Sequence, residues 1–316
     1  MKKFVVNILL FGLIFGILYL LLLRLTGVSA LHGNVSFVEQ NYGHLDARME
    51  EIGRQNEGDI LFLGSSHCYR SFDPRCYPGL KVFNLGSSNQ TPVQTLALLQ
   101  SYLDGLNPKR VIFEVHPDIM ANTGEESAVD VLSNCAIDRN VSRMAWSYRS
   151  MRVVNTWLYA MMKHGLNRPV ERGDDVVRVA TKVNGEDVMC DFTYVEGGFV
   201  ELPLLCYQPQ EAKPHSFRLE PRQLEALQQC LQLIAEKEIP VMLVETPASR
   251  NYYSSYTNHR DFELLMAEQG LYLNLNEADA LMDRLDDRRH FFDEDHLNQD
   301  GVQLLNEYLR ICILSD

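Results

Sequence analysis

The chain has 316 residues, of which 46% are apolar and 22% are charged. This composition supports a globular core and excludes a disordered or collagen-like chain. The formal charge is −13, and because the first 24 residues carry +3, the rest of the chain carries −16. Nucleic acid and anionic lipid are therefore unfavourable partners, since a phosphate surface is bound by clustered Lys and Arg.

The N-terminal segment predicts a membrane-spanning helix. Phe4 to Leu23 is a run of uncharged residues that, at 1.5 Å per residue, spans about 30 Å of hydrocarbon. Lys2 and Lys3 precede it, so the positive-inside bias places the N-terminus in the cytoplasm and the body of the chain outside it. We predict a retained anchor over residues 1–24. The alternative is a signal peptide cleaved after the small-x-small site Val28-Ser29-Ala30, although the apolar run is longer than that of a typical signal.

The cysteines do not indicate a structural metal. The seven cysteines include no C-x-x-C pair and no Cys/His spacing typical of zinc. In an oxidising compartment, the sequence-near options for a disulfide are Cys68 with Cys76 and Cys190 with Cys206. The odd number leaves one thiol free, and the sequence does not decide the pairing.

Helices and strands alternate along the body of the chain. The 3-4 spacing of apolar residues over Val35–Gln55 predicts an amphipathic juxtamembrane helix within residues 25–57. Short apolar runs then predict buried parallel strands at 59–63, 81–85, 110–115, 240–244 and 271–275. Helical spacing predicts helices at 91–105, 221–237, 262–269 and 298–309. This alternation is typical of an α/β fold with a doubly wound parallel sheet, whose ligand site lies beyond the carboxyl ends of the strands.

The alternation stops between about residues 119 and 217. This stretch contains Trp146, Trp157 and Met161-Met162 and is too long for an ordinary loop. We predict an inserted, partly helical cap region over the strand ends, where it would shape a substrate pocket. The alternative is a peripheral elaboration without contact to the site. The α/β domain then covers residues 58–316 with this insertion at about 119–217.

Polar residues at the strand ends carry the candidate chemistry. Ser66 stands where a buried strand turns into the next segment, a geometry that exposes the hydroxyl and directs backbone N–H groups at a developing oxyanion. A serine nucleophile needs a base that is oriented by a third group. Asp293 and His296 stand three positions apart before the last helix, so the carboxylate can hold one imidazole nitrogen and leave the other pointing outward. His67 is interpreted as a packing or gating residue.

The same C-terminal stretch also contains the donor types of a hard-metal site, namely His290, Asp293, Asp295 and His296. Adjacent residues point apart at a helix start, and no second ligand cluster follows. The sequence therefore predicts no metal and no cofactor, with metal-dependent hydrolysis as an alternative.

Three sequence blocks resemble the SGNH/GDSL hydrolase superfamily. They are the turn Gly64-Ser65-Ser66, the strand end Asn84-Leu85-Gly86 and the C-terminal block Asp293-Glu-Asp-His296-Leu-Asn-Gln-Asp-Gly301. More closely, they resemble the membrane-anchored bacterial branch of that superfamily, which includes the teichoic-acid D-alanylation protein. The resemblance covers about residues 58–118 and 221–312, and it implies an SGNH/flavodoxin-like sandwich.

The resemblance also implies roles for individual residues. Ser66 would be the nucleophile, His296 the general base and Asp293 its orienting acid. The backbone N–H groups of Ser66 and Gly86 would be the donors of the oxyanion hole.

One position departs from the family pattern. Family esterases usually carry a Gly-x-Asn-Asp turn whose Asn completes the oxyanion hole, whereas this chain has Val115-His116-Pro117-Asp118. Either His116 or Asn89 supplies the third donor, or the hole has two donors.

The function implied by the resemblance is that of a serine acyl-ester hydrolase or O-acyltransferase, anchored in the bacterial inner membrane and acting outside the cytoplasm on cell-envelope glycan. Its expected partners are an acyl donor, a glycan or other hydroxyl acceptor, and a membrane-bound O-acyltransferase. The alternative is a catalytically silent subunit that binds glycan or docks such an acyltransferase.

Overall fold

The structure is a computed structural model that describes residues 1–30, 35–38, 41–205 and 207–314. At its centre is an all-parallel sheet of five strands in the order β2-β1-β3-β7-β8. The strands are β1 (Ile60–Leu63), β2 (Val82–Asn84), β3 (Arg110–Glu114), β7 (Val241–Glu245) and β8 (Tyr272–Asn274). This is the strand order of a flavodoxin-like doubly wound sheet, so the predicted α/β fold class is confirmed.

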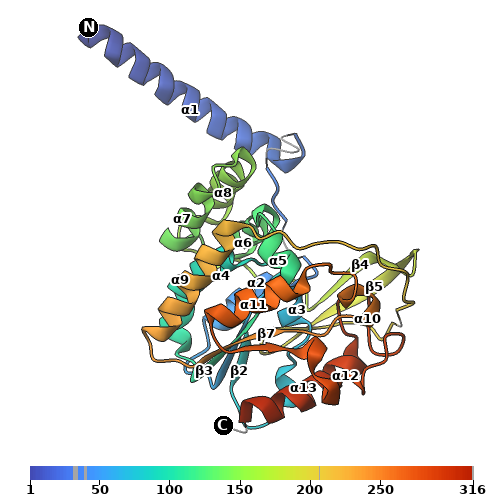
Figure 1. Ribbon diagram of the computed structural model, residues 1–316. Helices are drawn as coiled ribbons and strands as arrows, with labels where there is room; N and C mark the ends of the chain where they lie inside the picture. The colour runs from blue at the N-terminus through green and yellow to red at the C-terminus, as the bar shows by residue number, and fades with distance from the viewer. Residues whose placement is uncertain (31–34, 39–40, 206, 315–316) are drawn as a thin grey trace.

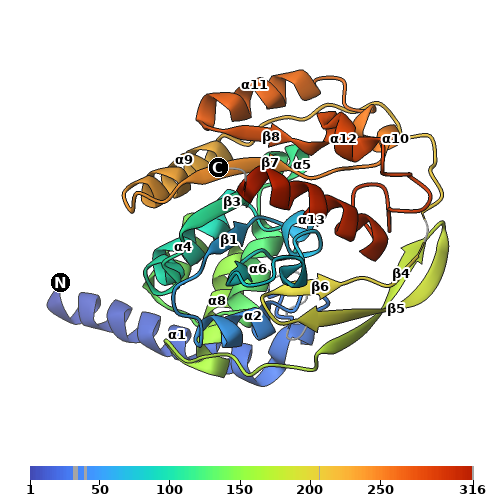
Figure 2. The same cartoon turned by 90° about the horizontal axis from the view of Figure 1, so that it is seen from below.

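Helices cover both faces of this sheet. Successive side chains along each strand point to opposite faces, so each strand contributes to the core on both sides. In β1, Ile60 and Phe62 pack toward α13, whereas Leu61 and Leu63 pack toward α4 and α9. Figure 2 shows α4 and α13 on opposite sides of the sheet. The long helices outside the inserted region are α4 (Pro92–Leu106), α9 (Pro221–Ala235), α11 (His259–Gln269) and α13 (Gln299–Leu314).

Short helices lie in the segments that follow the strands β1, β3, β7 and β8. They are α3 (Ser66–Tyr69), η1 (Pro74–Cys76), α5 (Pro117–Ala121), α10 (Arg250–Tyr253), η2 (Leu275–Glu277) and α12 (Asp279–Met282). Because α3 follows β1 and α5 follows β3, both start at the carboxyl edge of the sheet, where the polar residues of the sequence blocks also lie.

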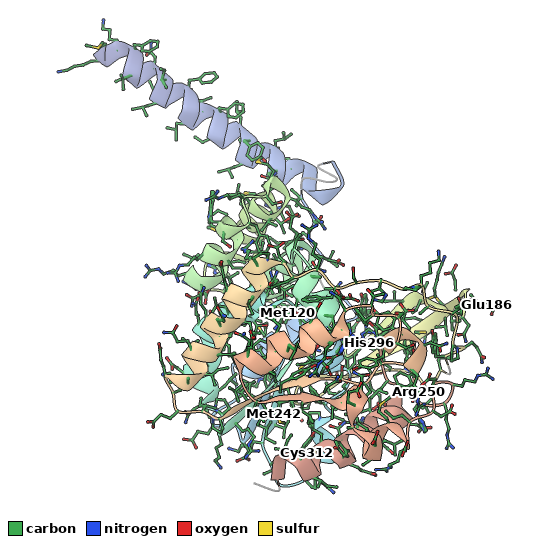
Figure 3. All side chains as sticks on the ribbon, viewed as in Figure 1. Met120, Glu186, Met242, Arg250, His296 and Cys312 are labelled. Carbon is green, nitrogen blue, oxygen red and sulfur yellow. The ribbon has the colours of Figure 1, made fainter. Side chains whose placement is uncertain are left out.

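The inserted region consists of two different halves. Its first half forms α6 (Glu125–Asn134), α7 (Arg139–Ser147) and α8 (Met151–His164), and its second half forms the antiparallel sheet β4 (Val176–Val183), β5 (Glu186–Val195) and β6 (Phe199–Glu201). Leu132 of α6 and Val141 of α7 are fully buried in the same core as the parallel strands. The helical half is therefore part of the domain core, whereas the tip of the β4–β5 hairpin, at Glu186, extends away from it (Figures 1 and 3).

The apolar N-terminal segment is a single helix, α1 (Lys2–Ala30), which projects from the domain in Figure 1. Its part Lys2–Leu25 is long and apolar enough to cross a membrane, with a mean hydropathy of 2.7. The segment is a candidate membrane span or signal sequence.

The juxtamembrane helix is shorter than predicted, since only α2 (Leu45–Ile52) is helical within Val35–Gln55. The Ser36 N–H donates to Thr156 Oγ1 at 3.0 Å, and the Val38 N–H donates to Ser133 Oγ at 3.1 Å. Side chains of α6 and α8 thus bind the backbone of this segment. The predicted helix is wrong over residues 35–38 and 41–44, and residues 39–40 lie outside the described residues.

The six described cysteines are free thiols. The disulfide option Cys68 with Cys76 is therefore not formed. The option Cys190 with Cys206 lies outside the described residues, because position 206 is not among them.

Candidate active site

Ser66 lies at a sharp turn that follows β1. Gly64 has φ of +143°, and a Cβ at this position would collide with the Glu114 carboxylate. Ser65 donates to Glu114 Oε2 through both its N–H (2.7 Å) and its hydroxyl (2.9 Å). Ser66 then begins α3, and the first N–H groups of a helix have no partner within the helix. The turn thus fixes Ser66 at the carboxyl edge of the sheet. Ser66 is only partly buried there.

His296 reaches Ser66 from the other end of the chain. Its Nε2 lies 2.9 Å from Ser66 Oγ, and its Nδ1 lies 2.9 Å and 3.0 Å from the two carboxylate oxygens of Asp293. Asp293 Oδ1 also accepts the His296 N–H at 2.8 Å, which closes the turn before α13. The structure therefore brings the three residues predicted from the sequence into one hydrogen-bonded chain.

A second carboxylate contacts the same imidazole. Asp295 Oδ1 lies 2.9 Å from His296 Nδ1, and Asp295 Oδ2 lies 3.2 Å from His67 Nε2. Burial alone would lower the pKa of His296, but the charges of Asp293 and Asp295 outweigh it and raise this pKa to about 10. Burial would likewise raise the pKa of Asp295, but His296 and His67 hold it well below its usual range. The sequence prediction missed this contact, for which the only signal was the run of three acidic residues directly before His296.

Three imidazole rings form a stack in the site. His67 lies between His296, at 4.5 Å and 2° between ring planes, and His116, at 4.3 Å and 11°. His116 Nδ1 accepts the Asp118 N–H at 3.3 Å. Burial, with His67 adding to it, holds the pKa of His116 well below its usual range. His116 is thus on the far side of His67, and among the described residues neither it nor Asn89 hydrogen-bonds to Ser66.

Gly86 packs directly on the serine turn. A Cβ at Gly86 would lie 2.9 Å from the Ser65 carbonyl oxygen and 3.0 Å from that of Gly64, so the close approach requires glycine. Within the described parts of the chain, the backbone N–H groups of Ser66 and Gly86 donate to no hydrogen bond outside regular helix or strand bonding. Both groups are therefore free to bind an anionic oxygen.

Two groups of side chains have ligand atoms within 4.8 Å of one another, close enough for a cation: His67 with His116 and Asp295, and Asp293 with Asp295 and His296. In the first group the His67 and His116 rings are nearly parallel, so their nitrogen lone pairs do not converge on one point. In the second, Nδ1 of His296 faces both carboxylates as a hydrogen-bond donor. His290 lies apart, with Nδ1 accepting the Asp286 N–H at 2.8 Å. The arrangement fits an acid–base site better than a metal centre.

A cavity of about 270 Å³ adjoins the acidic side of the site. Its lining includes Asp293 and Asp295 together with Lys182 of β4 and Tyr207. The strand half of the inserted region therefore lines a cavity beside Asp293 and Asp295, whereas the helical half belongs to the core; a cap over the strand ends stays a prediction.

No family model matches this chain, and no curated protein matches it. Solved structures similar to it include the following two. One is a candidate acylhydrolase from Bacteroides fragilis, with 12% identity, a TM-score of 0.41, and coverage of 88% of this chain and 99% of that chain. The other is a GDSL-like lipase from Bacteroides thetaiotaomicron, with 11% identity, a TM-score of 0.40, and coverage of 87% and 99%. The resemblance of the sequence blocks to the D-alanylation branch stays a prediction.

Proposed function

We propose that this chain is a serine acyl-ester hydrolase or O-acyltransferase, with Ser66 as nucleophile, His296 as general base and Asp293 as the acid that orients it. The observation that carries the proposal is the hydrogen-bonded chain from Ser66 Oγ through both imidazole nitrogens of His296 to the Asp293 carboxylate. Serine is activated by this constellation on several unrelated folds, so it is recognised by geometry rather than by overall fold.

The reaction follows from this geometry. Ser66 Oγ attacks the acyl carbonyl carbon while its proton passes to His296 Nε2. The carbonyl oxygen becomes an oxyanion that the N–H groups of Ser66 and Gly86 stabilise. The tetrahedral intermediate then expels the leaving alcohol, which takes the proton from His296, and the acyl group stays on Ser66. Water or an acceptor hydroxyl attacks the acyl-enzyme with His296 again as base, giving hydrolysis or transfer.

Two features support a specialised enzyme rather than a fast general esterase. His116 stands behind His67, and we take the oxyanion hole to have two donors, the N–H groups of Ser66 and Gly86; loss of one donor costs about 10²–10³ in rate. In addition, the charges of Asp293 and Asp295 raise the pKa of His296 to about 10, so at neutral pH little of the imidazole is in the neutral form that accepts the Ser66 proton.

We also propose that α1 anchors the enzyme in a bacterial inner membrane with the domain outside the cytoplasm. The length and hydropathy of α1 and the preceding Lys2 and Lys3 support this orientation. A cell-envelope glycan as acceptor and a membrane-bound O-acyltransferase as partner are proposed from the resemblance of the sequence blocks, which is an analogy at the level of family.

A fluorophosphonate probe tests the catalytic part of this proposal. Peptide mapping of the labelled full chain should locate the adduct on Ser66, and Ser66→Ala should remove it. The matched control Ser101→Ala changes a serine on α4 and should keep full labelling. A folded wild-type chain that takes no label would favour the silent-subunit alternative. Hydrolysis that survives Ser66→Ala but is lost with a chelator would favour metal-dependent chemistry.

A further inference from the structure

Positive charge is concentrated in one part of this acidic chain. Residues 139–168, which form α7, α8 and the turns beside them, contain five Arg and one Lys but no Asp or Glu. We refer to this segment as the basic hairpin. Its exposed basic residues are Arg139, Arg143, Arg149, Lys163 and Arg168.

The basic hairpin also exposes large apolar side chains. The exposed fractions are 56% for Trp146, 67% for Met151 and 57% for Leu166. Trp146 packs edge-on against Trp157 with ring centroids 5.4 Å apart, and these are the two tryptophans of the chain. Basic residues combined with exposed tryptophan and aliphatic side chains are typical of helices that lie in a membrane interface.

The position of α8 relative to α1 points to the same environment. The Tyr19 hydroxyl of α1 donates to Asn155 Oδ1 of α8 at 2.6 Å, and Leu23 is fully buried. Tyr19 stands six positions before Leu25, the end of the candidate span, which corresponds to about 9 Å along the helix. Interfacial helices bury their apolar face to about 5–10 Å, so a membrane-spanning α1 would hold α8 at this depth. Figure 1 shows α7 and α8 on the side of the domain from which α1 projects.

We infer that the basic hairpin is a membrane-contact surface that binds the anionic headgroups of the bilayer crossed by α1. The inference rests on the anchoring part of the proposed function. The net charge of the chain predicts that anionic lipid is unfavourable, but attraction to headgroups acts over about one Debye length, roughly 8 Å in physiological salt. The local charge of the hairpin therefore decides the interaction. Such a contact would fix the orientation of the domain on the membrane.

Tryptophan fluorescence tests this surface directly, because both tryptophans lie on it. The full chain carrying Trp157→Phe keeps Trp146 as its only tryptophan and is reconstituted into phosphatidylcholine vesicles with or without phosphatidylglycerol. We expect emission from Trp146 to lose intensity with brominated lipid, to resist iodide, and to shift further to the blue with phosphatidylglycerol. The control variant has both native tryptophans changed to Phe and carries Leu271→Trp, which places its single tryptophan just before β8. Iodide should quench the emission of this tryptophan, and brominated lipid should not.

Charge reversal separates the electrostatic contribution. The double variant Arg143→Glu and Arg149→Glu should lose the effect of phosphatidylglycerol. If Trp146 in vesicle-bound protein is quenched by iodide and not by brominated lipid, or is shielded from both quenchers as in a protein interface, the inference is overturned. An effect of phosphatidylglycerol that survives the double variant overturns the role assigned to the basic residues. Release of the protein from membranes by alkaline carbonate would refute the proposed anchor. This outcome is distinct from the fluorescence results, which test the membrane contact of the basic hairpin in protein that stays anchored.

Discussion

Replacing Asp295 by Asn should lower the pH at which the site becomes active. Asp295 Oδ1 lies 2.9 Å from His296 Nδ1, and with Asp293 it raises the pKa of this imidazole to about 10. Only the neutral imidazole accepts the Ser66 proton. The kcat/KM of the wild-type enzyme should therefore rise about tenfold per pH unit from neutral pH and level off near pH 10.

The size of the change follows from the contact that is lost. A hydrogen bond to a charged group is worth about 1.5–3 kcal/mol, and one pKa unit corresponds to 1.36 kcal/mol, so the midpoint should fall by about 1 to 2 pH units. The pKa of His296 should fall because the Asp295 carboxylate stabilises the charged imidazolium. The neutral imidazole gains no such stabilisation, so removing the carboxylate destabilises only the protonated form. Asp293 still holds Nδ1, so kcat/KM on the alkaline plateau should fall less than about tenfold.

The assay is hydrolysis of a chromogenic acetyl ester by the full chain across neutral and alkaline pH, with the rate of Ser66→Ala subtracted at each pH. Glu294→Gln is the matched control, since it removes the same charge from the adjacent residue, which has no described ion pair with His296. A midpoint in Asp295→Asn equal to that of the wild type would refute the reasoning. A loss of activity as complete as that of His296→Ala would instead make Asp295 the orienting acid.

Three further outcomes are expected. Ser66→Ala and His296→Ala should each remove nearly all ester hydrolysis, and the double variant should be no worse than either, since the hydroxyl and its base act as a unit; additive losses in kcat would contradict this. Gly86→Ala should lower kcat by about 10²-fold with little change in KM. The reason is that a Cβ would lie 2.9 Å from the Ser65 carbonyl oxygen and displace the second oxyanion donor. An unchanged kcat would exclude the Gly86 N–H as a donor. Leu132→Ala should lower the free energy of unfolding in denaturant by about 2–5 kcal/mol, whereas Leu204→Ala, at a side chain 64% exposed, should be nearly neutral; equal effects would show that α6 does not belong to the core.

The central sheet could be predicted because its strands are buried on both faces. The segments 59–63 and 110–115 each contain a run of three or four consecutive apolar residues, and the strands β1 and β3 lie within these segments. The spacing of Asp293 and His296 was equally informative, because a contact between residues three apart depends mainly on a local turn.

Features that depend on tertiary packing were not predicted. The apolar spacing that includes Phe37 and Val38 predicts a helix, but Phe37 packs edge-on against Tyr159 of α8, and the Val38 N–H bonds to Ser133 of α6. The stack of three imidazoles joins segments of the chain that no local pattern relates. Asp295 contacts His296 because the turn before α13 directs its side chain back toward the ring, whereas the sequence predicted that neighbouring residues would point apart.

Glu114 is a further case in which the sequence held an unused signal. It ends β3 in the buried sheet, where a carboxylate is costly unless it is hydrogen-bonded, and burial raises its pKa. The Glu114 carboxylate accepts hydrogen bonds from the N–H and the hydroxyl of Ser65, and these two bonds hold the serine turn in place. A charged residue among the buried apolar residues of a strand thus indicates a side chain that positions the catalytic turn.

The most direct test of the central claim is to trap the acyl-enzyme. The full chain is mixed with a chromogenic acetyl ester, quenched rapidly in acid and digested, and the peptides are mapped by mass spectrometry. The proposed mechanism predicts an added acetyl group on Ser66 that is absent from Ser66→Ala and disappears in wild type once the ester is consumed. Turnover of the ester with no acetyl group on Ser66 at any quench time, or with the group on another residue, would contradict it.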